Sequence, residues 1–172
     1  MGEPSQTRPT RITREDSVLL QADTDRVFKV LLDFHSYKDW WPRYIRFQFD
    51  DPGPVKVGAR LRISYQTSVR WVAEVTAIET NRRIAFRYGQ GAWEGTAEWT
   101  LKPELDGIRV SYSIDIVPVP FWLRTLGRFL DLGAIHSKQM QGVLGNLGSI
   151  LGSRRLASNV EKSNFPVSSN FD

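Results

Sequence analysis

Hydrophobic and polar residues alternate through residues 44–116, and this period of two predicts antiparallel β-strands. At residues 108–116, for example, Val110, Tyr112 and Ile114 alternate with polar side chains. Turn-forming residues separate the runs at positions 52–54, 80–81, 89–91 and 106–107. Because successive side chains of a strand point to opposite faces, the pattern predicts a six-stranded meander with one dry and one wet face.

A β-like run at residues 12–21, with Val18, Leu19 and Leu20 near its end, predicts a first strand, which we expect to pair with the last strand of the meander. Asp23 and Thr24 are favoured N-cap residues, and a helical pattern follows them at residues 27–34. A second short helix is predicted from about Ser36, and it must end before Pro42, which cannot continue a helix. Two short helices therefore separate the first and second strands.

Residues 121–152 have hydrophobic side chains at helical spacing and predict one long amphipathic helix. Pro118 and Pro120 precede it, and Gly152 is a suitable stop. At 100° per residue, its apolar arc contains Trp122, Leu126, Phe129, His136, Met140, Val143, Leu144, Leu147, Ile150 and Leu151.

These elements predict an α+β fold, in which a curved seven-stranded antiparallel sheet wraps around the long C-terminal helix. The sheet must curve, because one helix cannot cover a flat sheet of that width. Residues 12–152 are expected to form a single domain. Residues 1–11 and 153–172 are polar and aperiodic, and we expect them to be flexible.

Composition narrows the classes of function for this chain of 172 residues. It contains no cysteine, which excludes disulfides and thiolate metal sites. The absence of a secretory signal and of an apolar run of bilayer length predicts a cytoplasmic protein. The net charge is +4, but basic residues are interleaved with acidic ones, so no nucleic-acid partner is expected.

The dry face and the long helix bring together side chains typical of a small-molecule pocket, which has apolar walls and a few polar groups. The small residues Ala73, Gly95, Ala97 and Gly133 favour a cavity over a solid core, because the aromatic rings cannot fill the space beside them. By alternation, the arginines and glutamates of the strands point outward, so no carboxylate or arginine is expected inside. The candidate ligand-binding residues are Tyr65, Trp71, Phe86, Tyr88, Trp93, Trp99, Tyr112, Phe129, Gly133, His136 and Met140.

His136 has two interpretations. It could hydrogen-bond a ligand or act as a base, or it could be a buried histidine satisfied by Tyr65, Tyr112 or a backbone carbonyl. Neither a metal site nor a cofactor is predicted, since the other histidine, His35, belongs to a different element.

Phe121 and Trp122 predict either packing at the start of the helix or an apolar lip that allows transient membrane contact. Gly142, Gly145 and Gly148 lie in a row that could pack against the sheet or a second subunit, so both a monomer and a homodimer fit the sequence.

The order of three segments resembles the START-like or Bet v 1-like (SRPBCC) helix-grip superfamily, in particular its bacterial polyketide cyclase/dehydrase and lipid transport branch. The segments are DTDRVFKVLLDF at residues 23–34, YKDWWP at 37–42 and VG at 57–58, and the resemblance covers residues 12–152. It implies a deep cavity between the sheet and the last helix that binds lipids, sterols, polyketides or other apolar molecules. It does not imply one chemistry.

The leading hypothesis is therefore binding or transport of a hydrophobic small molecule. The alternative is an enzyme of the polyketide aromatase/cyclase type, with His136, Tyr112 and Tyr65 as candidate catalytic residues. The family's cyclases usually use a pocket arginine, and none is predicted to point inward here. A protein-interaction module is the third hypothesis, and a solid core would favour it.

Overall fold

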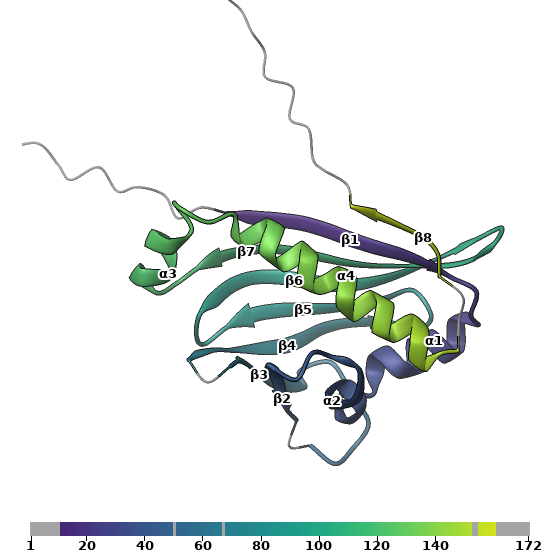
Figure 1. Cartoon of the computed structure of the whole chain (residues 1–172). Coiled ribbons are helices and arrows are strands. Elements are labelled where there is room, and N and C mark those ends of the chain that lie inside the picture. Colours follow the sequence, from purple (N-terminus) through teal and green to yellow (C-terminus); the bar gives the residue numbers. More distant parts are fainter. Residues whose placement is uncertain (1–10, 50, 67, 153–154, 161–172) are drawn as a thin grey trace, which may run out of the picture.

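The computed structural model describes residues 11–49, 51–66 and 68–152, and the backbone of 155–160. Its elements are β1 (Ile12–Leu20), α1 (Thr24–Leu32), η1 (Phe34–Ser36), α2 (Tyr37–Trp40), β2 (Ile45–Gln48), β3 (Arg60–Tyr65), β4 (Val69–Glu79), β5 (Arg83–Gly89), β6 (Trp93–Glu104), β7 (Gly107–Pro118), α3 (Phe121–Leu126), α4 (Leu132–Ile150) and β8 (Arg155–Val160). Figure 1 shows α4 lying across one face of the sheet, with α3 at one end and α1 and α2 at the other.

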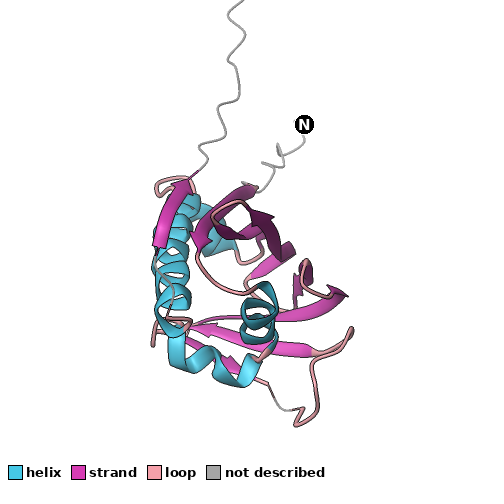
Figure 2. Cartoon of the chain, turned by 90° about the vertical axis from the view of Figure 1, so that its right-hand side faces the viewer, coloured by secondary structure: helices cyan, strands magenta, loops and turns pink. Residues whose placement is uncertain are grey.

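The strands form one antiparallel sheet in the order β2-β3-β4-β5-β6-β7-β1-β8. The sheet curls around α4 (Figure 2), which confirms the predicted helix-grip architecture. β1 pairs with β7, as the sequence predicted, with Ile12 opposite Ile116. The structure adds β8, which pairs with β1 and lies in the C-terminal segment for which the sequence predicts no regular structure. The other residues of the two predicted flexible ends, apart from Arg11, lie outside the described residues.

The prediction of a single helix over residues 121–152 is wrong, because a non-helical segment separates α3 from α4. Asp131 begins α4 as its N-cap, and its side chain accepts a hydrogen bond from the Ala134 backbone N–H at 2.9 Å. The break turns Trp122 and Phe129 away from the α4 core, and Phe129 is 80% exposed. The end of α4 is as predicted, since Gly152 has a φ of +63° just after the C-cap.

The half of the interior near α1 and α2 is solid. Tyr37 packs edge-on against Trp40, with ring centroids 5.0 Å apart, and its hydroxyl donates to the Leu31 carbonyl at 2.6 Å. Asn146 of α4 donates to the Trp40 carbonyl at 2.8 Å and so ties α4 to α2. Aromatic rings from four elements therefore fill the space under the C-terminal half of α4. These rings are Phe34, Tyr37, Trp40, Phe86 and Trp99.

Candidate functional site

A cavity of about 420 Å³ lies under the N-terminal half of α4, at the α3 end of the molecule. This volume is within the range of ligand pockets, and the walls are mostly apolar. Its residues come from β1 to β7 and both C-terminal helices. They are Ile12, Trp41, Ile45, Phe47, Ile63, Tyr65, Gln66, Ser68, Val69, Trp71, Tyr88, Trp93, Tyr112, Ile114, Ile116, Trp122, Leu123, Leu126, Leu130, Leu132, Ile135, His136, Gln139 and Met140.

Seven of the eleven candidate residues from the sequence line this cavity, although their contact with a ligand stays a prediction. They are Tyr65, Trp71, Tyr88, Trp93, Tyr112, His136 and Met140. Four do not line it. Phe86 and Trp99 belong to the solid half of the core, Phe129 is exposed in the segment between α3 and α4, and Gly133 packs against Arg14. All three candidate catalytic residues are cavity residues.

The small residues do not create the cavity in the way the sequence suggested. Ala73, Gly95 and Ala97 do not line it. Tight turns predict that Ala73 faces Tyr88 and that Ala97 faces Tyr112. The structure has the first pair, but Ala97 faces Ile114, because β6 ends at Glu104 and Leu105 and Asp106 form the turn. The space lies at the α3 end of the curled sheet, beyond the closely packed rings near α1 and α2.

The space beside Gly133 is occupied by the side chain of Arg14 and is not part of the cavity. A Cβ at this position would lie 2.7 Å from the Arg14 guanidinium carbon. Arg14 donates to the Thr13 carbonyl at 2.9 Å and to Asp131 at 3.3 Å, and it does not line the cavity. The expectation that every strand arginine points outward is wrong for Arg14, which extends toward the start of α4. The described cavity wall still contains no arginine.

Asp16 of β1 is the residue that the sequence analysis missed. It is completely buried, and it faces inward opposite Tyr112, so the expectation of no inner carboxylate is wrong. Gln141 donates to its Oδ1 at 3.3 Å, while Oδ2 has no hydrogen-bond partner and lies 3.9 Å from Nδ1 of His136. Alternation back from the apolar Val18 and Leu20 places Asp16 on the inner face and could have identified it.

His136 lies between the cavity and Asp16. Its ring stacks on that of Tyr112, with centroids 6.0 Å apart and an interplanar angle of 19°. Nδ1 is buried without a partner, so the expected partner from Tyr65, Tyr112 or the backbone is absent. Burial, and secondarily the charge of Arg14, lower the pKa of His136 to about 4, so the imidazole is neutral at pH 7.

Two tyrosines add hydroxyl groups to the cavity wall. The hydroxyl groups of Tyr88 and Tyr112 are hydrogen-bonded to each other. Burial raises the pKa of both tyrosines, so both are protonated at neutral pH. Among the described residues, no three His, Cys, Asp or Glu side chains are grouped closely enough to hold a metal ion.

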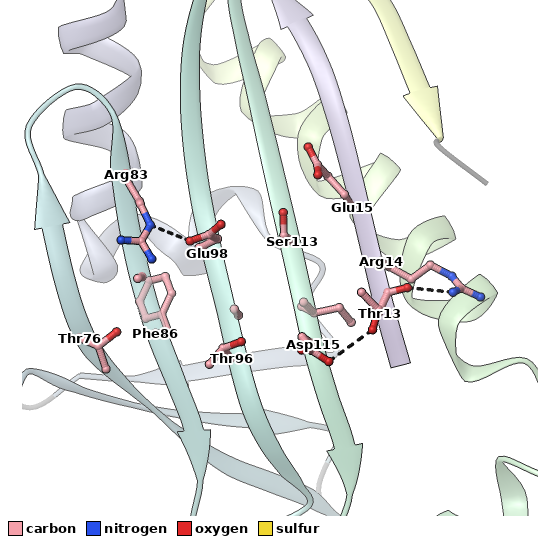
Figure 3. A pocket seen from close by; sticks show the side chains of 13 residues that line it. Thr13, Arg14, Glu15, Thr76, Arg83, Phe86, Thr96, Glu98, Ser113 and Asp115 are labelled. Carbon is pink, nitrogen blue, oxygen red and sulfur yellow. Dashed lines mark hydrogen bonds and ion pairs between the residues drawn. The ribbon is translucent and has the colours of Figure 1, made fainter. Parts of the chain in front are cut away.

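The outer face of the sheet contains a larger and more open hollow of about 770 Å³ (Figure 3). Ala85, Thr96 and Ser113 form part of its floor, and charged side chains surround it. Arg83 donates to Glu98 at 2.7 Å, and Thr13 donates to Asp115 at 3.3 Å. These cross-strand pairs satisfy one another at the surface, so the inner cavity is the stronger candidate for the functional site.

The rim of the inner cavity is apolar where α3 and the following turn meet α4. Trp122, Leu126, Leu130 and Ile135 line the cavity and are also 38–52% exposed. Phe121 beside them is 82% exposed, so the predicted packing at the helix start does not cover it. No described helix has the length and hydropathy needed to cross a membrane.

Three solved structures from different sources have a similar fold. The ginseng major latex-like protein 151 of Panax ginseng is 12% identical, with a TM-score of 0.65 over 82% of this chain and 97% of its own. A protein from Chromobacterium violaceum is 16% identical, with a TM-score of 0.61 over 81% of this chain and 96% of its own. The di-domain ARO/CYC StfQ of the steffimycin biosynthetic pathway is 16% identical, with a TM-score of 0.62 over 83% of this chain and 51% of its own.

At these identities the similarity shows the fold alone, which is the helix-grip fold. A search of curated proteins finds no match to the sequence. The family model described as polyketide cyclase/dehydrase and lipid transport matches residues 11–149, which include every element from β1 to the last turn of α4. The chain therefore belongs to the polyketide cyclase/dehydrase and lipid transport family.

Proposed function

We propose that this protein binds a hydrophobic small molecule in the inner cavity and carries it. The observation that supports this proposal best is the contrast between the two halves of the interior. Trp99 and its aromatic neighbours pack solidly near α2, whereas the space beside Trp71, Trp93 and Met140 holds a cavity of about 420 Å³. An apolar cavity of this size in a protein of this family is suited to an apolar metabolite.

The exposed apolar rim supports a route for the ligand. Trp122, Leu126 and Leu130 belong both to the cavity wall and to the surface, so a ligand that passes them stays in contact with apolar groups. The same residues, with Phe121, would allow transient contact with a membrane from which an apolar molecule is taken up. Both steps are parts of the proposed function.

A second function, catalysis of the aromatase/cyclase type, is favoured by one observation that the sequence did not predict. His136 has a buried carboxyl group behind it, that of Asp16, and a cavity in front of it. Such an arrangement can orient an imidazole for proton transfer. Because the described part of the cavity wall has no arginine, the proton-transfer groups of this function would be His136 and Tyr112.

Substitution of Val69 by tryptophan tests the binding function. Val69 is a half-buried residue at the start of β4 and lines the cavity, so an indole ring there should occupy ligand space. We expect Val69→Trp to weaken the binding of N-phenyl-1-naphthylamine, measured by its fluorescence enhancement, by at least about tenfold, or about 1.4 kcal/mol.

The matched control is Val72→Trp on the same strand. Val72 is also half-buried, but it lies on the opposite face of β4. This variant should bind the probe as the unmodified protein does. Equal binding by both variants and the unmodified protein would place the probe outside the inner cavity and contradict the proposal.

A further inference from the structure

The buried carboxyl group of Asp16 has an unusual environment. None of its residue surface is accessible, and only one of its two oxygens is hydrogen-bonded. A buried polar atom without a partner loses its hydrogen bonds to water and gains none, so such atoms are rare and call for an explanation. The surroundings of Oδ2 supply one, because the imidazole Nδ1 of His136 lies 3.9 Å from it.

The two unpaired atoms face each other. Nδ1 of His136 lies 3.9 Å from Oδ2 of Asp16, which is longer than a hydrogen bond but within reach of a small rotation of the ring. Functional hydrogen bonds are often long in unliganded structures and shorten when a ligand binds. Tyr112, stacked on the imidazole, limits the ring to motion close to its own plane.

The geometry assigns the hydrogen of the neutral imidazole to Nδ1, because a carboxylate oxygen can only accept there. Nε2 then carries a free lone pair. The side chain of His136 is 24% accessible and lines the cavity, and none of that accessible surface belongs to Nδ1. The cavity therefore faces the other side of the ring, where Nε2 is the polar atom.

We infer that Asp16 is a positioning residue that fixes His136 with Nε2 as a hydrogen-bond acceptor, so that the cavity selects hydrophobic ligands carrying an acidic hydroxyl group, such as a phenol or an enol. This inference rests on the proposed binding function and names its substrate class. A ligand hydroxyl donates to Nε2, and Nδ1–H donates to Asp16. A ligand that offers only an acceptor, such as a ketone, meets a lone pair and binds more weakly.

Three naphthalenes of similar size test this selection by isothermal titration calorimetry on the full chain at pH 7.5. They are 2-naphthol, which donates a hydrogen bond, and 2-methoxynaphthalene and 2-acetonaphthone, which only accept. We expect 2-naphthol to bind about tenfold more tightly than the other two, which corresponds to one hydrogen bond of about 1.4 kcal/mol. Equal affinities for all three would overturn the inference and leave the proposed function intact. Absence of binding by all three would overturn both.

Asp16→Asn separates positioning from a structural role. Gln141 donates to the Oδ1 position, so the asparagine oxygen should stay there and the amide nitrogen should face Nδ1. The imidazole hydrogen then moves to Nε2, and the preference should reverse in favour of 2-acetonaphthone. A purely structural effect would change the three affinities by one common factor and would contradict the inference.

His136→Phe provides a second variant that does not depend on the stability of Asp16→Asn. Phenylalanine keeps a flat ring beside Tyr112 but has no nitrogen. It should bind the three naphthalenes with equal affinity. A preference for 2-naphthol that persists in this variant would assign the selection to another group and overturn the inference.

Discussion

Gly95→Ala is expected to lower the free energy of unfolding by at least about 3 kcal/mol. Gly95 lies in β6 with a φ of +138°, a conformation that residues with a Cβ rarely adopt. An added Cβ would lie 2.1 Å from the Asp115 carbonyl oxygen and 2.8 Å from Cα of Ile116. Both contacts are to the backbone of β7, so the overlap cannot be relieved by a side-chain rotation.

Denaturation with urea measures this cost, and Gly142→Ala is its control. Gly142 lies in α4, and an added Cβ there meets no atom within 4 Å. Alanine should therefore raise the free energy of unfolding by about 0.5–1 kcal/mol through helix propensity and a less flexible unfolded chain. If Gly95→Ala changed the stability by less than about 1 kcal/mol, the close approach of β6 and β7 at this point would be wrong.

Acidification is expected to destabilise the fold through His136. Its pKa is about 4 in the folded protein and 6.5 in the unfolded chain, so the unfolded chain binds the extra proton between these values. The stability is complete above pH 6.5 and is lost as the pH falls to 4, by about 3 kcal/mol in total. The charged and titratable groups that face the imidazole are Asp16 and Arg14 from β1 and Tyr112 from β7.

His136→Gln removes this contribution. Urea denaturation at a series of pH values from 7.5 to 4 should show a steeper loss of stability for the unmodified protein than for the variant. His35→Gln, at an exposed position in η1, should retain the steep loss. A gain in stability on acidification that the variant lacks would contradict this account and indicate that Asp16 holds the imidazolium more strongly than burial opposes it.

The repeating parts of the fold were predictable because alternation is a local property. Residues 108–116 alternate without interruption and form the predicted strand β7, and the pairing of β1 with β7 followed from the need to extend the sheet. The register was less certain. The sequence from Glu104 to Gly107 allows a tight turn at more than one position, and each position gives a different pairing of β6 with β7. In the structure Glu104 pairs with Gly107, so Ala97 faces Ile114 and not Tyr112.

The helix break and the cavity could not be predicted in the same way. A projection at 100° per residue assumes a continuous helix, so it placed Phe129 beside His136, whereas Asp131 begins a separate helix. The position of the cavity depends on which aromatic rings meet in three dimensions. Trp99 and Phe86 lie on the dry face, as do Tyr88 and Trp71, but only packing against η1 and α2 decides which of these rings are surrounded by others.

Asp16 differs from these cases, because alternation with the inward-facing Val18 and Leu20 could have placed it on the inner face, although the sequence analysis missed it. A polar residue on a core face conflicts with its local pattern, and such conflicts are common at functional sites. β8 is a contrasting case, since its sequence has no apolar period and its place in the sheet comes from pairing with β1.

Native mass spectrometry of the freshly purified protein, before and after extraction with organic solvent, tests most directly whether the inner cavity binds a hydrophobic molecule. The account predicts a mass above that of the polypeptide, lost on extraction and regained when 2-naphthol is added, and a smaller fraction of loaded protein for Val69→Trp than for Val72→Trp. A mass equal to that of the polypeptide in every sample, with 2-naphthol present in excess, would contradict it.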